Sequence, residues 1–170
     1  MNRVSQSRIN EIGPDRACAE WLMRNGALIR WKGDTNFLTS YDNLPKDDEA
    51  TGKKFHLQEV DATDSSIAHH GFAHFKNCKY IECIKFDNCL YLEDQGLKDL
   101  EAVKSSLESL IIWRCPNITD DGLLSLTSLL KLRTLQLAEL KQVKDLKKCT
   151  RKLQGFLPNC NITMADQVKK

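Results

Sequence analysis

Apolar positions in the second half of the chain recur with a spacing of 26 residues. Counted from Cys89, apolar residues stand eight, five and three positions earlier, and an Asp, a Gly and two Leu stand five, seven, eight and eleven positions later. Counted from Cys115, the same residue classes occupy the same offsets. Each unit predicts a short strand with alternate residues buried, followed by a short helix with one apolar stripe.

Two weaker copies of this unit flank the pair, one around Ser65 and one around Leu140. The pattern L-x-x-L-x-L-x-x-C-x-x-I-x-D-x-G-L-x-x-L resembles the cysteine-containing leucine-rich repeat. The Cys is expected to end the strand with its thiol turned inward, and the Asp to cap the helix that follows. Such a unit cannot bury its apolar face alone, so the units are expected to stack.

We therefore predict an α/β fold with a small α+β capping domain at residues 1–56. A leucine-rich-repeat domain follows at 57–170, a short solenoid with parallel strands inside and helices outside. Its approximate repeats are 57–80, 81–106, 107–131 and 132–160, and it includes a basic C-terminal tail.

Within the capping domain, Pro14 at a first turn and Gly26 beyond a last turn predict a helix over about 14–25. A strand is expected at 27–31 and a turn or mobile loop at 46–52. A last partial strand is expected near 157–162.

Charge is distributed unevenly along the chain. The 25 basic and 23 acidic residues give a net charge of +2, which argues against a dedicated nucleic-acid binder. Eight basic and two acidic residues lie within 141–170, so this segment carries +6. It is either a solvated face or a docking surface for an acidic protein or anionic lipid head groups. No apolar run is long enough for a transmembrane helix.

Candidate chemistry is sparse. The seven Cys form an odd count without C-x-x-C spacing, which predicts mostly buried, reduced thiols. His69, His70 and His74 form an HHxxxH cluster. In a helix His70 and His74 would lie one turn apart and could share a metal, but a partly exposed helix surface is the favoured interpretation. The chain has no Gly-rich phosphate loop and no nucleophile elbow, so we do not predict an enzyme.

The three tryptophans suggest where a partner binds. Trp21 is expected in the core and Trp31 half exposed, whereas Trp113 should alternate outward onto the concave face of the solenoid. Trp and Arg are enriched at interface hot spots. The predicted partner-binding strip comprises Lys85, Asp87, Trp113, Arg114 and Gln136.

The N-terminal segments 12–17, 20–22, 26–27 and 41–45 resemble the N-terminal domain of the mitochondrial coupling factor B family, also called ATP synthase subunit s. The resemblance continues through 60–65, 91–94 and 115–120. It implies a non-catalytic protein, peripheral on the matrix side of the mitochondrial inner membrane. Its partners would be membrane-sector or stalk subunits of the ATP synthase, and it would support coupling by limiting proton leak.

The resemblance also implies a weak Mg²⁺ site at Gly26 and Thr63, where Asp61 and Asp64 would hold the ion's waters. The alternative is that Gly26 only ends a helix and Thr63 only forms a turn. The sequence departs from relatives with a C-x-C pair, because Asp87-Asn88-Cys89 stands at that place. Two alternative functions stay open: a respiratory complex I assembly factor and an F-box-type leucine-rich repeat adaptor.

Overall fold

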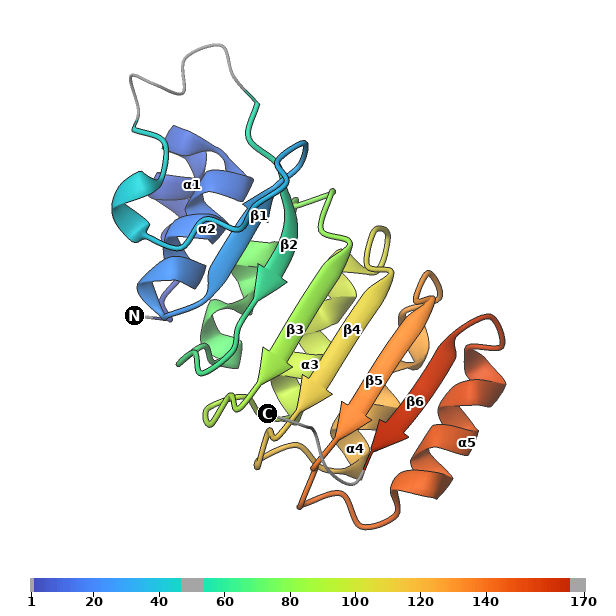
Figure 1. Ribbon diagram of the computed structural model, residues 1–170. Helices are drawn as coiled ribbons and strands as arrows, with labels where there is room; N and C mark the ends of the chain where they lie inside the picture. Colours follow the sequence, from blue (N-terminus) through green and yellow to red (C-terminus); the bar gives the residue numbers. More distant parts are fainter. Residues whose placement is uncertain (1, 47–53, 166–170) are drawn as a thin grey trace.

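A six-stranded sheet forms the centre of the protein (Figure 1). The computed structural model describes residues 2–46 and 54–165. The strands lie in sequence order, β1 antiparallel to β2 and every later pair parallel. They are β1 (Leu28–Trp31), β2 (Leu57–Asp61), β3 (Cys83–Asp87), β4 (Ser109–Trp113), β5 (Thr134–Ala138) and β6 (Asn161–Ala165).

The helical segments η2, α3 and α4 lie behind the sheet, on one of its faces, and α5 lies beside β6 at the edge of the sheet and packs against α4 (Figure 1). Each connects one parallel strand to the next, so the mixed α/β class and the four strand–helix steps agree with the prediction. The helices are α1 (Gln6–Ile12), α2 (Pro14–Arg24), α3 (Asp94–Asp99), α4 (Asp120–Leu124) and α5 (Leu146–Phe156). Shorter 3-10 segments are η1 (Tyr41–Asn43), η2 (His69–Phe75), η3 (Leu100–Val103) and η4 (Ser125–Ser128).

The register of the sheet explains the spacing in the sequence. Ile84 pairs with Leu110, which pairs with Leu135, and these side chains form a fully buried row. A second buried row comprises Phe86, Ile112 and Leu137. Because alternate residues of a strand face opposite sides, a slip of one residue would expose both rows.

The cysteine that follows each of two strands ends that strand, as predicted. The Cys89 thiol donates to the Ala62 carbonyl at 2.9 Å, and the Cys115 thiol donates to the Trp113 carbonyl at 3.2 Å. All seven cysteines are free, and all except the half-buried Cys83 are buried. The thiols therefore satisfy carbonyl groups where the chain turns out of the sheet.

The repeated aspartates differ from the prediction. Asp94 and Asp120 each begin a helix but neither caps it. Asp94 instead accepts from the backbone N–H of Thr119 at 2.8 Å, one unit further along the chain. Asp120 likewise accepts from the N–H groups of Lys144 and Asp145. Of these three aspartates, Asp145 is the one that acts as an N-cap, accepting from the Lys148 N–H at 2.9 Å.

These carboxylates therefore tie each unit to the next rather than stabilising their own helix. Gly122 is required beside the first of them, because a Cβ there would overlap Asp94 Oδ1. The glycine at this repeat position thus allows two units to approach closely.

The N-terminal region forms the predicted helix and strand, as α2 and β1, and adds α1, which the sequence did not indicate. Trp21 is buried as expected and stacks on His74, with ring centroids 5.0 Å apart. Trp31 is only 6% exposed, so its predicted half exposure is wrong. Its ring lies 5.3 Å from that of Phe55, and β1 packs into the common core.

Three further predictions are shifted in position, fall outside the described residues, or stay untested. The last strand exists but lies at 161–165 rather than 157–162. Most of the turn expected at 46–52 and the last lysines of the basic tail lie outside the described residues. The boundary after residue 56 stays a prediction, because β1 and β2 pair within one sheet.

Candidate functional site

The face of the sheet opposite the helices carries the residues predicted to bind a partner. Lys85, Ile111 and Gln136 pair across β3, β4 and β5 in one half-buried row. Trp113 pairs with Asp87 on one side and Ala138 on the other. The structure thus places four of the five strip residues on neighbouring strands, and Arg114 directly follows β4.

Charges around Trp113 are arranged in a compact cluster. The Arg114 guanidinium donates to both carboxylate oxygens of Asp87, at 2.8 and 2.6 Å. The Lys85 ammonium lies 3.9 Å from Asp87 Oδ2 and 5.0 Å from the centroid of the Trp113 ring. The bond to Asp87 raises the pKa of Arg114. Bidentate pairing and cation–π contact together hold the indole in a fixed orientation.

A ladder of left-handed residues follows the strands at their carboxyl ends. Asp64, Asn88, Arg114 and Glu139 have φ between 48° and 56°. The N–H groups of Asn88 and Arg114 donate to the carbonyls of Trp113 and Ala138 in the adjacent strand. Because the backbones align, Asn88 donates to Asp64 Oδ1 at 2.7 Å, and Arg114 lies 4.0 Å from Glu139.

Sequence reasoning missed this ladder. The signal was available, since its last three members each directly follow a strand at nearly the repeat spacing.

A shallow hollow of about 210 Å³ adjoins Trp113 on the exposed face. It is bounded by Gln136 on β5 and by Thr163 and Met164 on β6. A half-buried indole beside a hollow and a flexible thioether is the composition of a protein-binding surface.

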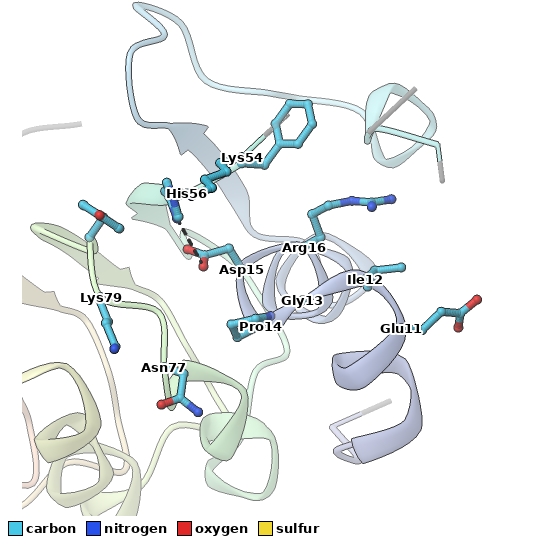
Figure 2. Close-up of a pocket in the computed structure, with 12 residues that line it drawn as sticks. Glu11, Ile12, Gly13, Pro14, Asp15, Arg16, Lys54, His56, Asn77 and Lys79 are labelled. Carbon is cyan, nitrogen blue, oxygen red and sulfur yellow. Dashed lines mark ion pairs between the residues drawn. The ribbon is translucent and has the colours of Figure 1, made fainter. Parts of the chain in front are cut away.

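A larger cavity of about 550 Å³ lies where α2 meets the segments leading into β2 and β3 (Figure 2). The carboxylate of Asp15 points into this junction, accepting from the Leu57 N–H at 2.8 Å and lying 3.6 Å from His56 Nδ1. Burial raises the pKa of Asp15. The contact joins segments 42 residues apart, which is why the sequence did not reveal it.

Lys54, Lys79 and Arg16 also line this cavity. The cations do not make it an anion site, because Asp15 already occupies the first turn of α2, where an anion would bind. The arrangement therefore holds α2 against the sheet.

The segments that would hold Mg²⁺ are adjacent. The Ser66 N–H donates to the Asn25 carbonyl at 2.9 Å, which brings Gly26 close to the turn at 63–65. Thr63 donates through its hydroxyl and its N–H to Asp61 Oδ1, at 2.6 and 3.0 Å. Gly26 follows the last turn of α2 with φ of 92°, so both residues also have the local roles proposed as the alternative.

The donor set fits a weakly held, largely hydrated Mg²⁺. A backbone carbonyl and a hydroxyl are hard oxygen ligands, and Asp61 and Asp64 flank them. Across residues 2–46 and 54–165, no group of three or more His, Cys, Asp and Glu side chains is placed to bind a metal.

The histidine cluster is divided between surface and core. The rings of His69 and His70 lie 3.9 Å apart, whereas His74 is buried and its Nδ1 lies 2.8 Å from the Gly71 carbonyl. The expectation of an exposed helix surface is therefore wrong for His74. Burial lowers the pKa of this imidazole. In the part of the chain that the structure describes, no helix has the length and apolar character to span a membrane.

The fold and its exposed face define an α/β protein built from four successive strand–helix units on one sheet. No family model matches the chain. It is 36% identical over 168 residues to ATP synthase subunit s, mitochondrial, of Bos taurus, covering 96% of this chain and 82% of that protein. The protein of the same name from Homo sapiens is 34% identical over the same shares.

The protein of that name from Rattus norvegicus is 39% identical over 147 residues, which cover 85% of this chain and 72% of the relative. The chain belongs to the family of mitochondrial ATP synthase subunit s.

Proposed function

We propose that the chain is a non-catalytic accessory subunit that associates with the mitochondrial ATP synthase. Its relatives are named as mitochondrial subunits of that enzyme. The observation that carries the proposal is the family relationship over nearly the whole chain, together with an exposed sheet face whose Trp113 and Arg114 have the composition of an interface hot spot.

The strand–helix units are, in this proposal, leucine-rich repeats of the cysteine-containing type. The buried thiols after β3 and β4, the in-register apolar rows, and the glycines at the same position of α3 and α4 support this assignment. A curved repeat array presents its sheet face to a partner, so we place membrane-sector or stalk subunits against the strip formed by Lys85, Asp87, Trp113, Arg114 and Gln136.

The protein would lie peripherally on the matrix side of the inner membrane and limit proton leak. Oxygen consumption by depleted mitochondria, measured with ATP synthesis blocked, should fall when the protein is added back. Unchanged consumption would contradict the role in coupling.

Co-migration on blue-native gels tests the partner. Tagged wild-type protein should migrate with the ATP synthase, and Trp113→Ala should reduce the bound fraction at least several-fold. Tyr91→Ala is the control, because Tyr91 is also a solvent-accessible aromatic residue, more exposed than Trp113, but lies in the loop after β3. Equal capture of both variants would refute the assignment of this strip as the partner-binding surface.

Migration with respiratory complex I would instead support the assembly-factor alternative. An F-box-type adaptor is disfavoured. The described residues before β2 hold two α-helices of seven and eleven residues, and β1 belongs to the sheet.

Mg²⁺ would be held by the Gly26 carbonyl and the Thr63 hydroxyl, with waters bound to Asp61 and Asp64. The ion would supply only a link between α2 and the turn after β2. Calorimetric titration of Mg²⁺ should give heat with wild type and none with Asp61→Asn/Asp64→Asn. Absence of heat from both proteins would exclude the site.

A further inference from the structure

Helix α5 presents a cationic face to solvent. Lys147 and Arg151 stand one turn apart, as do Lys148 and Lys152, and all four side chains are exposed. The buried residues of the helix, Cys149, Thr150 and Leu153, lie on its other side. With 100° between successive residues, the four cations occupy an arc of about 140° opposite this buried stripe. Lys141 and Lys144 extend the charge into the preceding segment.

These six cations have no carboxylate partner. None lies within 4.0 Å of an Asp or Glu oxygen in the described part of the chain, whereas Arg8, Arg30 and Arg114 all do. The nearby carboxylates of Asp120 and Asp145 accept from backbone N–H groups instead. The positive potential of α5 is therefore not neutralised locally, although residues 1–140 carry a net charge of −4.

The composition of this face differs from that of the strip around Trp113. Five of its six cations are lysines, a residue type depleted at protein–protein interfaces, where Arg and aromatic residues are enriched. Lysine is a mobile point charge suited to a surface of many equivalent phosphates. Phe156 ends the same helix with 64% of its surface exposed, which supplies an apolar side chain at the level where head groups meet acyl chains.

We propose that the exposed face of α5 docks on the surface of a bilayer containing anionic phospholipids. The lysines and Arg151 neutralise phosphate groups, and Phe156 inserts its ring at the interface. Helix α5 connects β5 to β6 and packs against α4 on the helical side of the sheet, whereas the strip around Trp113 lies on the opposite face, so the strip stays open to a protein partner while the helix contacts lipid. This inference rests on the charges of α5 and does not depend on the proposed function.

Vesicle flotation with the full chain tests the inference. The probe is phosphatidylcholine vesicles with and without a minority of phosphatidylglycerol. Wild-type protein should float with the anionic vesicles only. Binding should be lost between about 0.1 M and 1 M salt, because the screening length falls from about 10 Å to about 3 Å. Each cation near the surface contributes roughly a factor of five to the partition coefficient.

Charge-matched variants locate the surface. Lys147→Glu/Arg151→Glu should lower partitioning by at least a hundredfold, whereas Lys76→Glu/Lys98→Glu carries the same charge change on exposed residues elsewhere and should retain most binding. Phe156→Ser should weaken binding several-fold and Tyr91→Ser should not. Thermal melting confirms that each variant is folded, and Lys148→Gln/Lys152→Gln provides a milder version of the first variant.

Two outcomes would overturn the inference. One is equal loss of binding in both double Glu variants, which would reflect net charge alone. The other is absence of flotation by wild type, even where α5 variants impair capture of the ATP synthase. That result would assign the face to an acidic protein instead.

Discussion

Arg114, in a left-handed conformation just after β4, donates two hydrogen bonds to the carboxylate of Asp87 at the end of β3. The Asp87 side chain is only 3% exposed, whereas that of Arg114 is 33% exposed. Lys85 also approaches the carboxylate, at 3.9 Å. The buried partner of this pair is thus the anion. Removing Arg114 therefore leaves a buried charge without its main partner, whereas removing Asp87 leaves a cation that can reach solvent.

Arg114→Ala should lower the melting temperature, because it leaves the Asp87 carboxylate buried with only Lys85 nearby. Adding Asp87→Ala to that variant should recover part of the loss, since the unpaired buried charge is then removed. Thermal unfolding of the two single variants and the double variant measures this coupling. A double variant that is less stable than Arg114→Ala would contradict the argument.

Two glycines provide a matched pair of substitutions. Gly122→Ala should destabilise the fold by about 1–3 kcal/mol, because its Cβ would displace the Asp94 carboxylate from Thr119. Gly155→Ala, in α5 with no atom within 4 Å of the new Cβ, should stabilise by about 0.5–1 kcal/mol. Urea unfolding measures both free energies, and effects of the same sign would refute the interpretation.

His74 should make stability depend on pH below neutrality. The pKa of His74 is about 6.5 in the unfolded chain, and burial lowers it in the folded chain. The unfolded chain therefore binds more protons than the folded chain once the pH falls below about 6.5. The free energy of unfolding should therefore fall as the solution is acidified below about pH 6.5, by at most about 1.4 kcal/mol per pH unit from this group.

His74→Phe should reduce that slope, whatever it does to stability at neutral pH. His70→Phe, an exposed neighbour, is the comparison. Urea unfolding of the three proteins across this pH range gives the slopes, and an unchanged slope in His74→Phe would exclude His74 as its source.

Cys83 should be the first thiol to react in the native protein, because the other six are buried. Burial raises the pKa of Cys83 as well, so its reaction should still be slower than that of a free thiol. Mass spectrometry after brief maleimide treatment should show one label on wild type and none on Cys83→Ser. Labelling of a buried cysteine first would indicate that the core opens locally.

The sequence predicted the strands well because one side chain in two is buried at a fixed spacing, as the rows containing Ile84 and Phe86 show. It predicted that Asp94 begins a helix but not that its carboxylate accepts from the Thr119 N–H, because that hydrogen bond forms only when two units stack. Trp31 and His74 were misplaced for a related reason. Their burial comes from Phe55 and Trp21, which no local pattern connects to them.

The candidate site divides in the same way. Alternation along β3, β4 and β5 placed Lys85, Trp113 and Gln136 on one face. The ladder through Asp64, Asn88 and Glu139 required the backbone conformation at each strand end, and the contact between Asp15 and His56 required the position of α2.

Strand β1 runs opposite to the five strands beyond it. A strand of reversed direction cannot offer the parallel hydrogen-bonding pattern that another copy of the unit would need on that side. Related proteins with longer arrays should therefore have gained their extra units between β2 and the edge at β6, or beyond β6. The reversed strand β1 then stays the fixed first edge of every array.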